Sequence, residues 1–435
     1  REPTPSTPSR QRHSRAMPRR LDVYLRDRLV GVLEQNDAGQ LRFQYAGDWL
    51  ADPARLALSQ SLPLRPEPFD SAATRPFFAG LLPEAEKRDL IAQALGVSTR
   101  NDFALLDGIG GECAGAITFV QPGNKPPSEP AATDYRRLNE AQLAKILTAL
   151  PTRPLLVGEE GVRLSLAGAQ DKLPVLLVNA GIALPLHSAP SSHIIKPPIR
   201  RFADTVHNEG FCLALAAEAG LHVIKSDIRQ AKDEVYLLVE RYDRQRDPSG
   251  VVRRLHQEDL CQALGYPPEI KYQAEGGPTL RQCFDMVRRA TARPVVELAR
   301  LLDAVIFNLL VGNNDAHSKN YSLLHADRGT ELAPIYDVSS TIVYPDLSPR
   351  FAMAIGDQKE FSDLHPRHFE RFAKEAGLGA APVRRRLLEL AEQLPNAARE
   401  VQNRFKAAGH DRPIIANIVS TIGTRARQLR KRFEA

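Results

Sequence analysis

The sequence predicts an α+β protein in which strand-rich segments precede a large helical region. Short apolar runs bounded by turn residues, typical of β-strands, fill much of the first 256 residues. Apolar residues at helical spacing dominate from residue 257 onward. A chain of 435 residues is also too long for one compact core, so we expect several domains.

Composition and pattern divide the chain into four segments. Residues 1–16 are rich in Arg, Pro, Ser and Thr and carry almost no apolar side chains, so we expect a disordered extension. Residues 17–150 are predicted to form an α/β domain. Residues 151–256 are predicted to form a small β-rich lobe, and residues 257–435 an all-helical large lobe.

Local signals define the expected elements in order. In the N-terminal domain we predict strands over 21–25, 29–33, 41–45 and 116–120 and helices over 77–95 and 140–150, with a turn at 36–39. In the small lobe we predict strands over 164–166, 173–178, 193–196 and 235–240 and a helix over 208–219. In the large lobe we predict helices over 257–264, 280–289, 294–311, 368–375, 381–394 and 414–431.

The net charge of +6 is concentrated at the two ends of the chain. Residues 1–20 carry six Arg and one Glu, and residues 419–435 carry five basic residues and one Glu, so the remainder is slightly acidic. This is not the charge of a basic nucleic-acid-binding protein, so any contact with DNA must be local. The most apolar run, 301–311, is short and contains Asp303, so we expect a buried helix and no membrane span.

The four cysteines are far apart in the sequence and form no C-x-x-C pair. This spacing favours reduced, buried thiols in a cytoplasmic protein, with a zinc site or a disulfide framework as the alternatives. The residues are Cys113, Cys212, Cys261 and Cys283.

The stretch 313–320 reads NNDAHSKN and follows the apolar run that ends at residue 311. It places Asp315 and Asn320 five positions apart, and Asp337 follows Asp315 by 22 residues. Phosphoryl transfer in kinase-like enzymes uses such a set, because one Asp orients the acceptor hydroxyl while an Asn and a later Asp hold Mg²⁺. Taken alone, the stretch is also explained as a polar helix end followed by a loop, with Asp337 as an N-cap.

Three further stretches are candidates for the same site. Lys196 ends an apolar strand from which it could reach phosphates, and the backbone of 239–244 could pair with an adenine. Small residues in 165–172 could let backbone N–H groups approach phosphates. Taken one at a time, these are also a solvated Lys, a strand end with surface ion pairs, and a tight turn.

Together these stretches occur in the order of a kinase-like nucleotide cleft: phosphate loop, Lys, hinge, catalytic Asp, metal-binding Asn and metal-binding Asp. As a set they resemble the HipA family of bacterial toxin kinases. The resemblance is carried by 164–172, 193–196, 239–244, 257–262, 271–272, 276–278, 315–320 and 336–337, with 77–83 and 115–116 in the N-terminal domain. It extends from about residue 17 to the C-terminus and implies a two-lobed, kinase-like fold behind an additional N-terminal domain.

The resemblance also implies roles for individual residues. Asp315 would be the catalytic base, Asn320 and Asp337 would hold Mg²⁺, and Lys196 would bind phosphate oxygens of ATP. Ser165 matches the family's autophosphorylated serine, whose phosphate would add about −1.5 to −2 charge and oppose ATP binding. The residues expected around the nucleotide are Ala167, Gly168, Ala169, Gln170, Asp171, Lys172, Lys196, Glu240, Arg241, Tyr242, His317, Ser318, Lys319, Asn320, Tyr336 and Asp337.

The partners implied by the resemblance are a helix-turn-helix antitoxin similar to HipB, in a heterotetramer, and operator DNA bound through that complex. Lys374 lies near the position at which the family touches DNA. The expected protein substrate is an aminoacyl-tRNA synthetase, notably glutamyl-tRNA synthetase, whose phosphorylation would inhibit translation and arrest growth. The main alternative is an inactive kinase that acts as an antitoxin-binding co-repressor, and a third is a small-molecule phosphotransferase.

Overall fold

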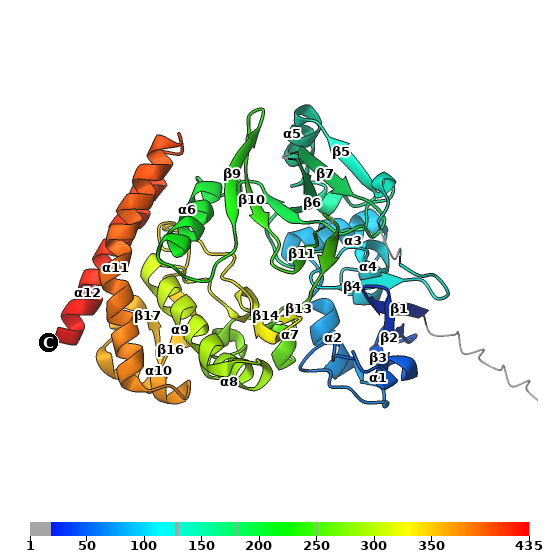
Figure 1. The fold of residues 1–435 in the computed structure, drawn as a ribbon, viewed down its shortest axis with the longest axis horizontal. Coiled ribbons are helices and arrows are strands. Elements are labelled where there is room, and N and C mark those ends of the chain that lie inside the picture. Colours follow the sequence, from blue (N-terminus) through cyan, green and yellow to red (C-terminus); the bar gives the residue numbers. More distant parts are fainter. Residues whose placement is uncertain (1–18, 127–129, 180, 249, 435) are drawn as a thin grey trace, which may run out of the picture.

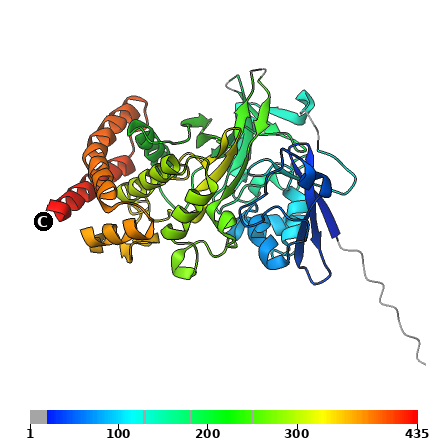
Figure 2. The ribbon, with the colours of Figure 1, turned by 60° about the horizontal axis from the view of Figure 1, so that its bottom comes forward.

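The computed structural model describes residues 19–126, 130–179, 181–248 and 250–434, so the extension predicted for residues 1–16 lies outside the described residues. Figure 1 shows the N-terminal strands at one end of an elongated molecule and the C-terminal helices at the other. The middle of the chain lies between them, and the rotated view in Figure 2 shows the same order.

A four-stranded antiparallel sheet with the order β3-β2-β1-β4 forms the N-terminal domain. The helical region predicted over 77–95 is observed but is interrupted, because the chain leaves helical geometry between residues 80 and 84. Pro83 lacks a backbone N–H and disfavours helical geometry in the residue before it, so two helices form instead. The elements are β1 (Arg19–Leu25), β2 (Arg28–Gln35), β3 (Leu41–Tyr45), α1 (Gly47–Ala51), α2 (Ser71–Ala79), α3 (Ala85–Leu95), α4 (Asp102–Ile109) and β4 (Ile117–Val120).

A six-stranded sheet with the order β5-β7-β6-β8-β10-β9 forms the small lobe. Strand β5 belongs to this sheet, and the helix after it packs against the sheet. The prediction placed residues 135–150 in the first domain, so the sheet extends across the expected boundary at residue 150. The strand predicted over 164–166 is wrong: Leu164 forms a single bridge with Glu112, because this segment packs on the N-terminal domain. The elements are β5 (Tyr135–Leu138), α5 (Glu140–Ala149), β6 (Leu173–Val178), β7 (Gly181–Pro185), β8 (His193–Lys196), α6 (Thr205–Glu218), β9 (Ser226–Ala231) and β10 (Glu234–Glu240).

The remainder of the chain is mainly helical, as expected, but it also contains strands that the prediction of an all-helical lobe missed. The segment 257–264, predicted as one helix, begins as strand β13, which pairs with β14. The helices are α7 (Leu260–Leu264), α8 (Leu280–Ala290), α9 (Pro294–Val311), α10 (Pro366–Glu375), α11 (Ala380–Ala407) and α12 (Pro413–Glu434). The strands of this lobe are β13 (His256–Asp259), β14 (Ser322–Ala326), β15 (Gly329–Leu332), β16 (Arg350–Ile355) and β17 (Gln358–Glu360). Two short strands ahead of them, β11 (Arg244–Arg246) and β12 (Val252–Arg254), pair with each other within the segment predicted as the small lobe.

Two large hydrophobic cores hold these parts together. One fills the large lobe, where α9 packs against α8, α11 and α12, and it also includes one face of α6 from the small lobe. The other joins the N-terminal sheet to β6, β7 and β8 of the small lobe, so these two parts share a core. The α+β fold class is therefore confirmed. Within the described ranges, no helix is long and apolar enough to cross a membrane.

Candidate active site

Lys196 lies at the centre of a buried group of charges where the small lobe meets the large lobe. It is the last residue of β8, and its Nζ atom lies 2.6 Å from Oε1 of Glu209 in α6 and 2.7 Å from Oδ1 of Asp337. The sequence analysis identified Lys196 and Asp337 but missed Glu209. An acidic residue in the helix that follows the Lys strand, a pairing common to kinases, is the signal that could have found it.

The charges of this group stabilise one another. Burial alone would lower the pKa of Lys196, but the charges of Asp337 and Glu209 outweigh it and raise that pKa above its ordinary value. The charge of Lys196 in turn holds the pKa of Asp337 well below its ordinary value, while burial raises that of Glu209. The Asp337 side chain is 45% exposed, so an ionised carboxylate remains open to a ligand beside a protonated Lys.

Asp337 and Asn320, the two expected metal-binding residues, lie in contact with each other. Asp337 has a φ of 56°, in the left-handed region that a non-glycine residue rarely adopts. The Asn320 side-chain N–H donates to the Asp337 carbonyl at 3.4 Å. Among the described residues there is no cluster of three or more His, Cys, Asp or Glu side chains that would hold a metal ion by itself. A carboxylate with one amide oxygen instead fits Mg²⁺, which is commonly held by one or two carboxylates together with phosphates.

Asp315 follows the end of α9 and is exposed. The helix ends at Gly312, where φ is 78° and an added Cβ would lie 2.4 Å from the Ile342 side chain, so glycine is required for this turn. Oδ1 of Asp315 accepts a hydrogen bond from the Tyr272 hydroxyl at 2.8 Å. The second carboxylate oxygen, Oδ2, is the one that could accept a proton from a substrate hydroxyl. The position suits a base that faces an incoming hydroxyl group.

The loop over residues 165–172 approaches this group of charges from the N-terminal side. Gly168 has a φ of 105°, and the Lys172 ammonium donates to the Ala167 carbonyl at 2.5 Å. Burial lowers the pKa of Lys172. Ala169 is exposed and Gln170 half-buried at the tip of the loop, and Asp171 forms an ion pair with Lys87 at 2.9 Å.

Ser165, the expected autophosphorylation site, is fully buried. Its hydroxyl donates to the Leu81 carbonyl at 2.8 Å, and its N–H donates to the Glu112 carbonyl at 2.9 Å. A phosphate donor could reach this hydroxyl only after the segment leaves its position.

Some backbone groups of the expected adenine-binding segment, Glu240–Tyr242, already form hydrogen bonds within the protein. The N–H groups of Glu240 and Arg241 donate to the carbonyls of Lys225 and Ser192 at 2.9 and 3.0 Å. The Arg241 side chain is turned away into a buried network, and its carbonyl accepts the Arg244 N–H at 3.2 Å. Tyr242 stacks on Tyr336 with ring centroids 5.3 Å apart.

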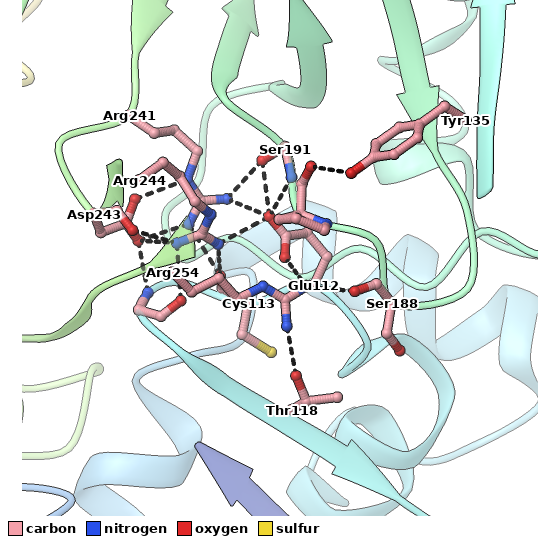
Figure 3. A network of polar contacts seen from close by, with 12 residues as sticks. Glu112, Cys113, Thr118, Tyr135, Ser188, Ser191, Arg241, Asp243, Arg244 and Arg254 are labelled. Atoms are coloured by element: carbon pink, nitrogen blue, oxygen red, sulfur yellow. Dashed lines mark hydrogen bonds and ion pairs between the residues drawn. The ribbon is translucent and has the colours of Figure 1, made fainter. Parts of the chain in front are cut away.

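Figure 3 shows this buried network, which the sequence analysis missed. The Glu112 carboxylate lies 3.1 Å from Arg241 and 2.8 Å from Arg244, and also pairs with Arg254. Asp243 binds Arg241 at 2.7 Å and accepts the Gly115 N–H at 2.6 Å. The residues after α4 in the N-terminal domain are thereby tied to the hinge by charge-assisted hydrogen bonds.

Three further residues expected at the nucleotide have side chains committed to the protein itself. The Lys319 ammonium donates to Asp259 at 3.0 Å, and its high pKa reflects the charges of Asp259 and Glu84 overcoming burial. The Ser318 hydroxyl lies 2.9 Å from the Cys261 sulfur, and the Tyr336 hydroxyl donates to the Lys319 carbonyl at 2.7 Å.

These side chains therefore support the segment after Asp315. The Lys319 ammonium is paired with Asp259 in this arrangement, and its contact with the nucleotide stays a prediction. His317 is buried beside the same segment, and burial lowers its pKa. The exposed Lys374 lies in α10, near the C-terminal end of the molecule in Figure 1, and is not part of this site. The four cysteines are buried and unpaired in the described chain, as expected.

The buried Lys–Glu pair, the Asp after a helix and the Asn–Asp pair, set between a strand-rich and a helical lobe, define a kinase-like protein. The family models place it more narrowly. Residues 21–120 match the model of the HipA N-terminal domain, and residues 164–400 match that of the HipA-like C-terminal domain. The chain belongs to the HipA family, which confirms the resemblance read from its motifs.

Known relatives agree with this assignment. Y4mE of Sinorhizobium fredii, a protein named as a kinase, is 48% identical to this chain over 412 residues. The match covers 94% of this chain and 98% of Y4mE. The serine/threonine-protein kinase toxin HipA of Shewanella oneidensis is 30% identical over 394 residues, covering 88% and 89%. A solved complex of Shewanella oneidensis HipA, HipB and operator DNA contains a chain that matches with a TM-score of 0.81 at 29% identity, covering 94% and 97%.

Proposed function

We propose that this protein is an ATP- and Mg²⁺-dependent serine/threonine protein kinase that acts as the toxin of a toxin–antitoxin pair. The observation that carries the proposal is the buried Lys196, paired with Glu209 and with the exposed carboxylate of Asp337. An ammonium held charged in this way beside an open carboxylate is suited to polyphosphate and its metal ion. A chain that had lost catalysis would have little physical reason to keep these buried charges, because burying them is costly.

In the reaction, the acceptor hydroxyl oxygen forms a bond to the γ-phosphorus of ATP as the bond to the β–γ bridging oxygen breaks and ADP leaves. Asp315 orients the hydroxyl and accepts its proton at the carboxylate, from which the proton passes to solvent. Lys196 neutralises charge on the phosphates. Asn320 and Asp337 would hold Mg²⁺, which, when bound, neutralises charge developing on the transferred phosphoryl group.

The remaining contacts to ATP are assigned by position. The loop from Ala167 to Lys172 would cover the phosphates, because Gly168 and the exposed Ala169 allow a close approach of the backbone. With the Glu240 and Arg241 N–H groups already bonded, the Glu240 carbonyl and the Tyr242 N–H are the candidates for pairing with adenine.

The proposed partners follow those of relatives. The matched Shewanella oneidensis HipA chain is in a complex with HipB and operator DNA, which supports an antitoxin partner and operator binding for this chain. From the family resemblance we further propose that the antitoxin has a helix-turn-helix and that the complex is a heterotetramer. Lys374, exposed on α10, would add a phosphate contact. An aminoacyl-tRNA synthetase in the bacterial cytoplasm is the proposed substrate, and phosphorylation of Ser165 would silence the enzyme.

The test is phosphate incorporation from γ-labelled ATP by the purified protein, with and without Mg²⁺, followed by phosphoamino acid analysis. We expect label on serine or threonine only when Mg²⁺ is present, and a loss of at least about 100-fold in Asp337→Asn. No incorporation by the wild type with ATP bound would favour the co-repressor instead. Equal incorporation in wild type and Asp337→Asn would contradict the metal-binding role of Asp337.

A further inference from the structure

A short segment of the N-terminal domain, Pro83-Glu84 between α2 and α3, contacts two loops of the proposed site. Pro83 forms a parallel bridge with Gly168, and the Glu84 N–H donates to the Gly168 carbonyl at 3.1 Å. The Glu84 carboxylate lies 2.7 Å from the Lys271 ammonium and 3.6 Å from that of Lys319. One residue therefore contacts the loop over the phosphates and the segment that follows Asp315.

The two neighbouring ammonium groups keep the Glu84 carboxylate ionised. Burial alone would raise its pKa, but the charges of Lys319 and Lys271 outweigh burial and lower it. The Glu84 side chain is only 13% exposed, so water screens these attractions weakly. The carboxylate is therefore ionised at neutral pH and holds both ammonium groups.

Lys271 is followed in the chain by the residue that contacts the candidate base. The Tyr272 hydroxyl donates to Oδ1 of Asp315 at 2.8 Å, and its ring meets that of His317 edge-on at 5.3 Å. Burial first, and then the charge of Asp315, raise the pKa of Tyr272, so its hydroxyl stays a donor throughout the physiological range.

The backbone that presents Tyr272 is built for this geometry. The Gly277 N–H donates to the Tyr272 carbonyl at 2.9 Å. A Cβ at position 277 would lie 2.6 Å from the Ile270 carbonyl oxygen and 2.8 Å from that of Tyr272, so glycine is required for the turn. Placement of the hydroxyl therefore depends on this turn and on the Lys271 ion pair at its base.

We propose that Glu84 is a positioning residue of the phosphotransfer site, through which the N-terminal domain sets Lys271 and Tyr272 and thereby the Asp315 carboxylate. This inference rests on the proposed kinase function. With Oδ1 of Asp315 fixed by Tyr272, Oδ2 is left to accept the proton of the acceptor hydroxyl. The N-terminal domain is then a part of the active site and not a separate module.

The experiment measures kcat and the KM for ATP in Glu84→Gln, Tyr272→Phe and the double variant, with Glu84→Asp as the conservative change. We expect kcat to fall by about 10- to 100-fold in each single variant, as misplacement of a reacting group by about 1 Å does, while the KM for ATP changes little. The double variant falls no further than the worse single one, because both act on Asp315. Glu84→Asp recovers part of the loss.

Glu269→Gln is the matched control. Glu269 binds Arg75 at 2.6 Å across the same domain boundary and lies three residues before Tyr272 in the same loop between α7 and α8. It touches neither Asp315 nor Glu84 in the described contacts, so we expect wild-type kcat.

The outcomes separate this inference from the proposed function. Wild-type kcat in Glu84→Gln and Tyr272→Phe, with Asp315→Asn inactive, overturns the positioning role while leaving the kinase intact. Multiplicative losses in the double variant also overturn it, because they show independent effects. Activity in Asp315→Asn overturns the proposed function and this inference with it. Thermal unfolding of each variant checks the fold, and Tyr272→Phe removes only a hydroxyl, so it provides the test even if Glu84→Gln is unstable.

Discussion

Glu112→Gln tests whether the buried network in Figure 3 stabilises the junction between the N-terminal domain and the hinge. The substitution keeps the shape of the side chain and removes its charge, leaving Arg241, Arg244 and Arg254 around a neutral amide. Glu112 is 1% exposed, so solvent compensates little for the loss. Removing one partner of a buried ion pair typically costs about 3–5 kcal/mol, because the remaining charge stays buried.

The pKa of Glu112 gives a second route to the same magnitude. Burial would raise that pKa, but the charges of Arg244, Arg254 and Arg241 outweigh burial and lower it from 4.5 to about 2. A lowering of this size corresponds to about 3 kcal/mol of stabilisation at neutral pH. The stabilisation is complete above pH 4.5 and is lost as the pH falls towards 2, because the unfolded carboxyl takes up its proton first.

Urea unfolding followed by circular dichroism measures the effect. At pH 7 we expect the free energy of unfolding of Glu112→Gln to be lower than that of wild type by about 3–5 kcal/mol. At pH 3 the difference should shrink by about 2 kcal/mol. Glu360→Gln is the control: its partner Arg350 is 70% exposed, so we expect a change within about 0.5 kcal/mol. A pH-independent difference, or none at pH 7, would refute the reasoning.

Three further predictions concern the site and its partners. Lys196→Met should abolish phosphate transfer and lower the melting temperature, because Glu209 is left buried without its cation. Adding Glu209→Leu should restore the melting temperature but not the activity. Restored activity would contradict the assignment of Lys196 as a phosphate-binding residue. Gly168→Ala should raise the KM for ATP about 5- to 30-fold in steady-state assays, since a φ of 105° strains any residue with a Cβ; an unchanged KM would exclude this loop from the nucleotide site. Lys374→Ala should leave kinase activity unchanged and reduce the salt dependence of operator binding by the antitoxin complex by about one counterion in mobility-shift assays, whereas an unchanged slope would remove Lys374 from the DNA interface.

Helices and strands that are determined by a local sequence pattern, and the site residues that lie on them, could be predicted from the sequence. The helix predicted over 294–311 is observed as α9 (Pro294–Val311), and the strands predicted over 173–178 and 193–196 are observed as β6 and β8. The strand that carries Lys196, and the turn and helix that carry Asp315, each leave a local pattern, so these two residues could be identified.

The carboxylates that complete the site could not be found in the same way. Glu84 and Glu112 act on residues 187 and 129 positions away in the chain, and neither lies in a motif that records its partner. Secondary structure failed where tertiary contacts decide it: the apolar residues around Leu164 pack on the N-terminal domain, and the residues after 256 pair with β14 before a helix begins.

The central claim is that Asp315 serves as the base of a protein kinase. The most direct measurement is the rate of γ-phosphoryl transfer from Mg²⁺·ATP to protein hydroxyls by Asp315→Asn, with ATP affinity and unfolding temperature measured on the same samples. The account predicts a loss of at least about 100-fold in kcat with ATP affinity and fold unchanged. A rate within about tenfold of wild type would contradict it.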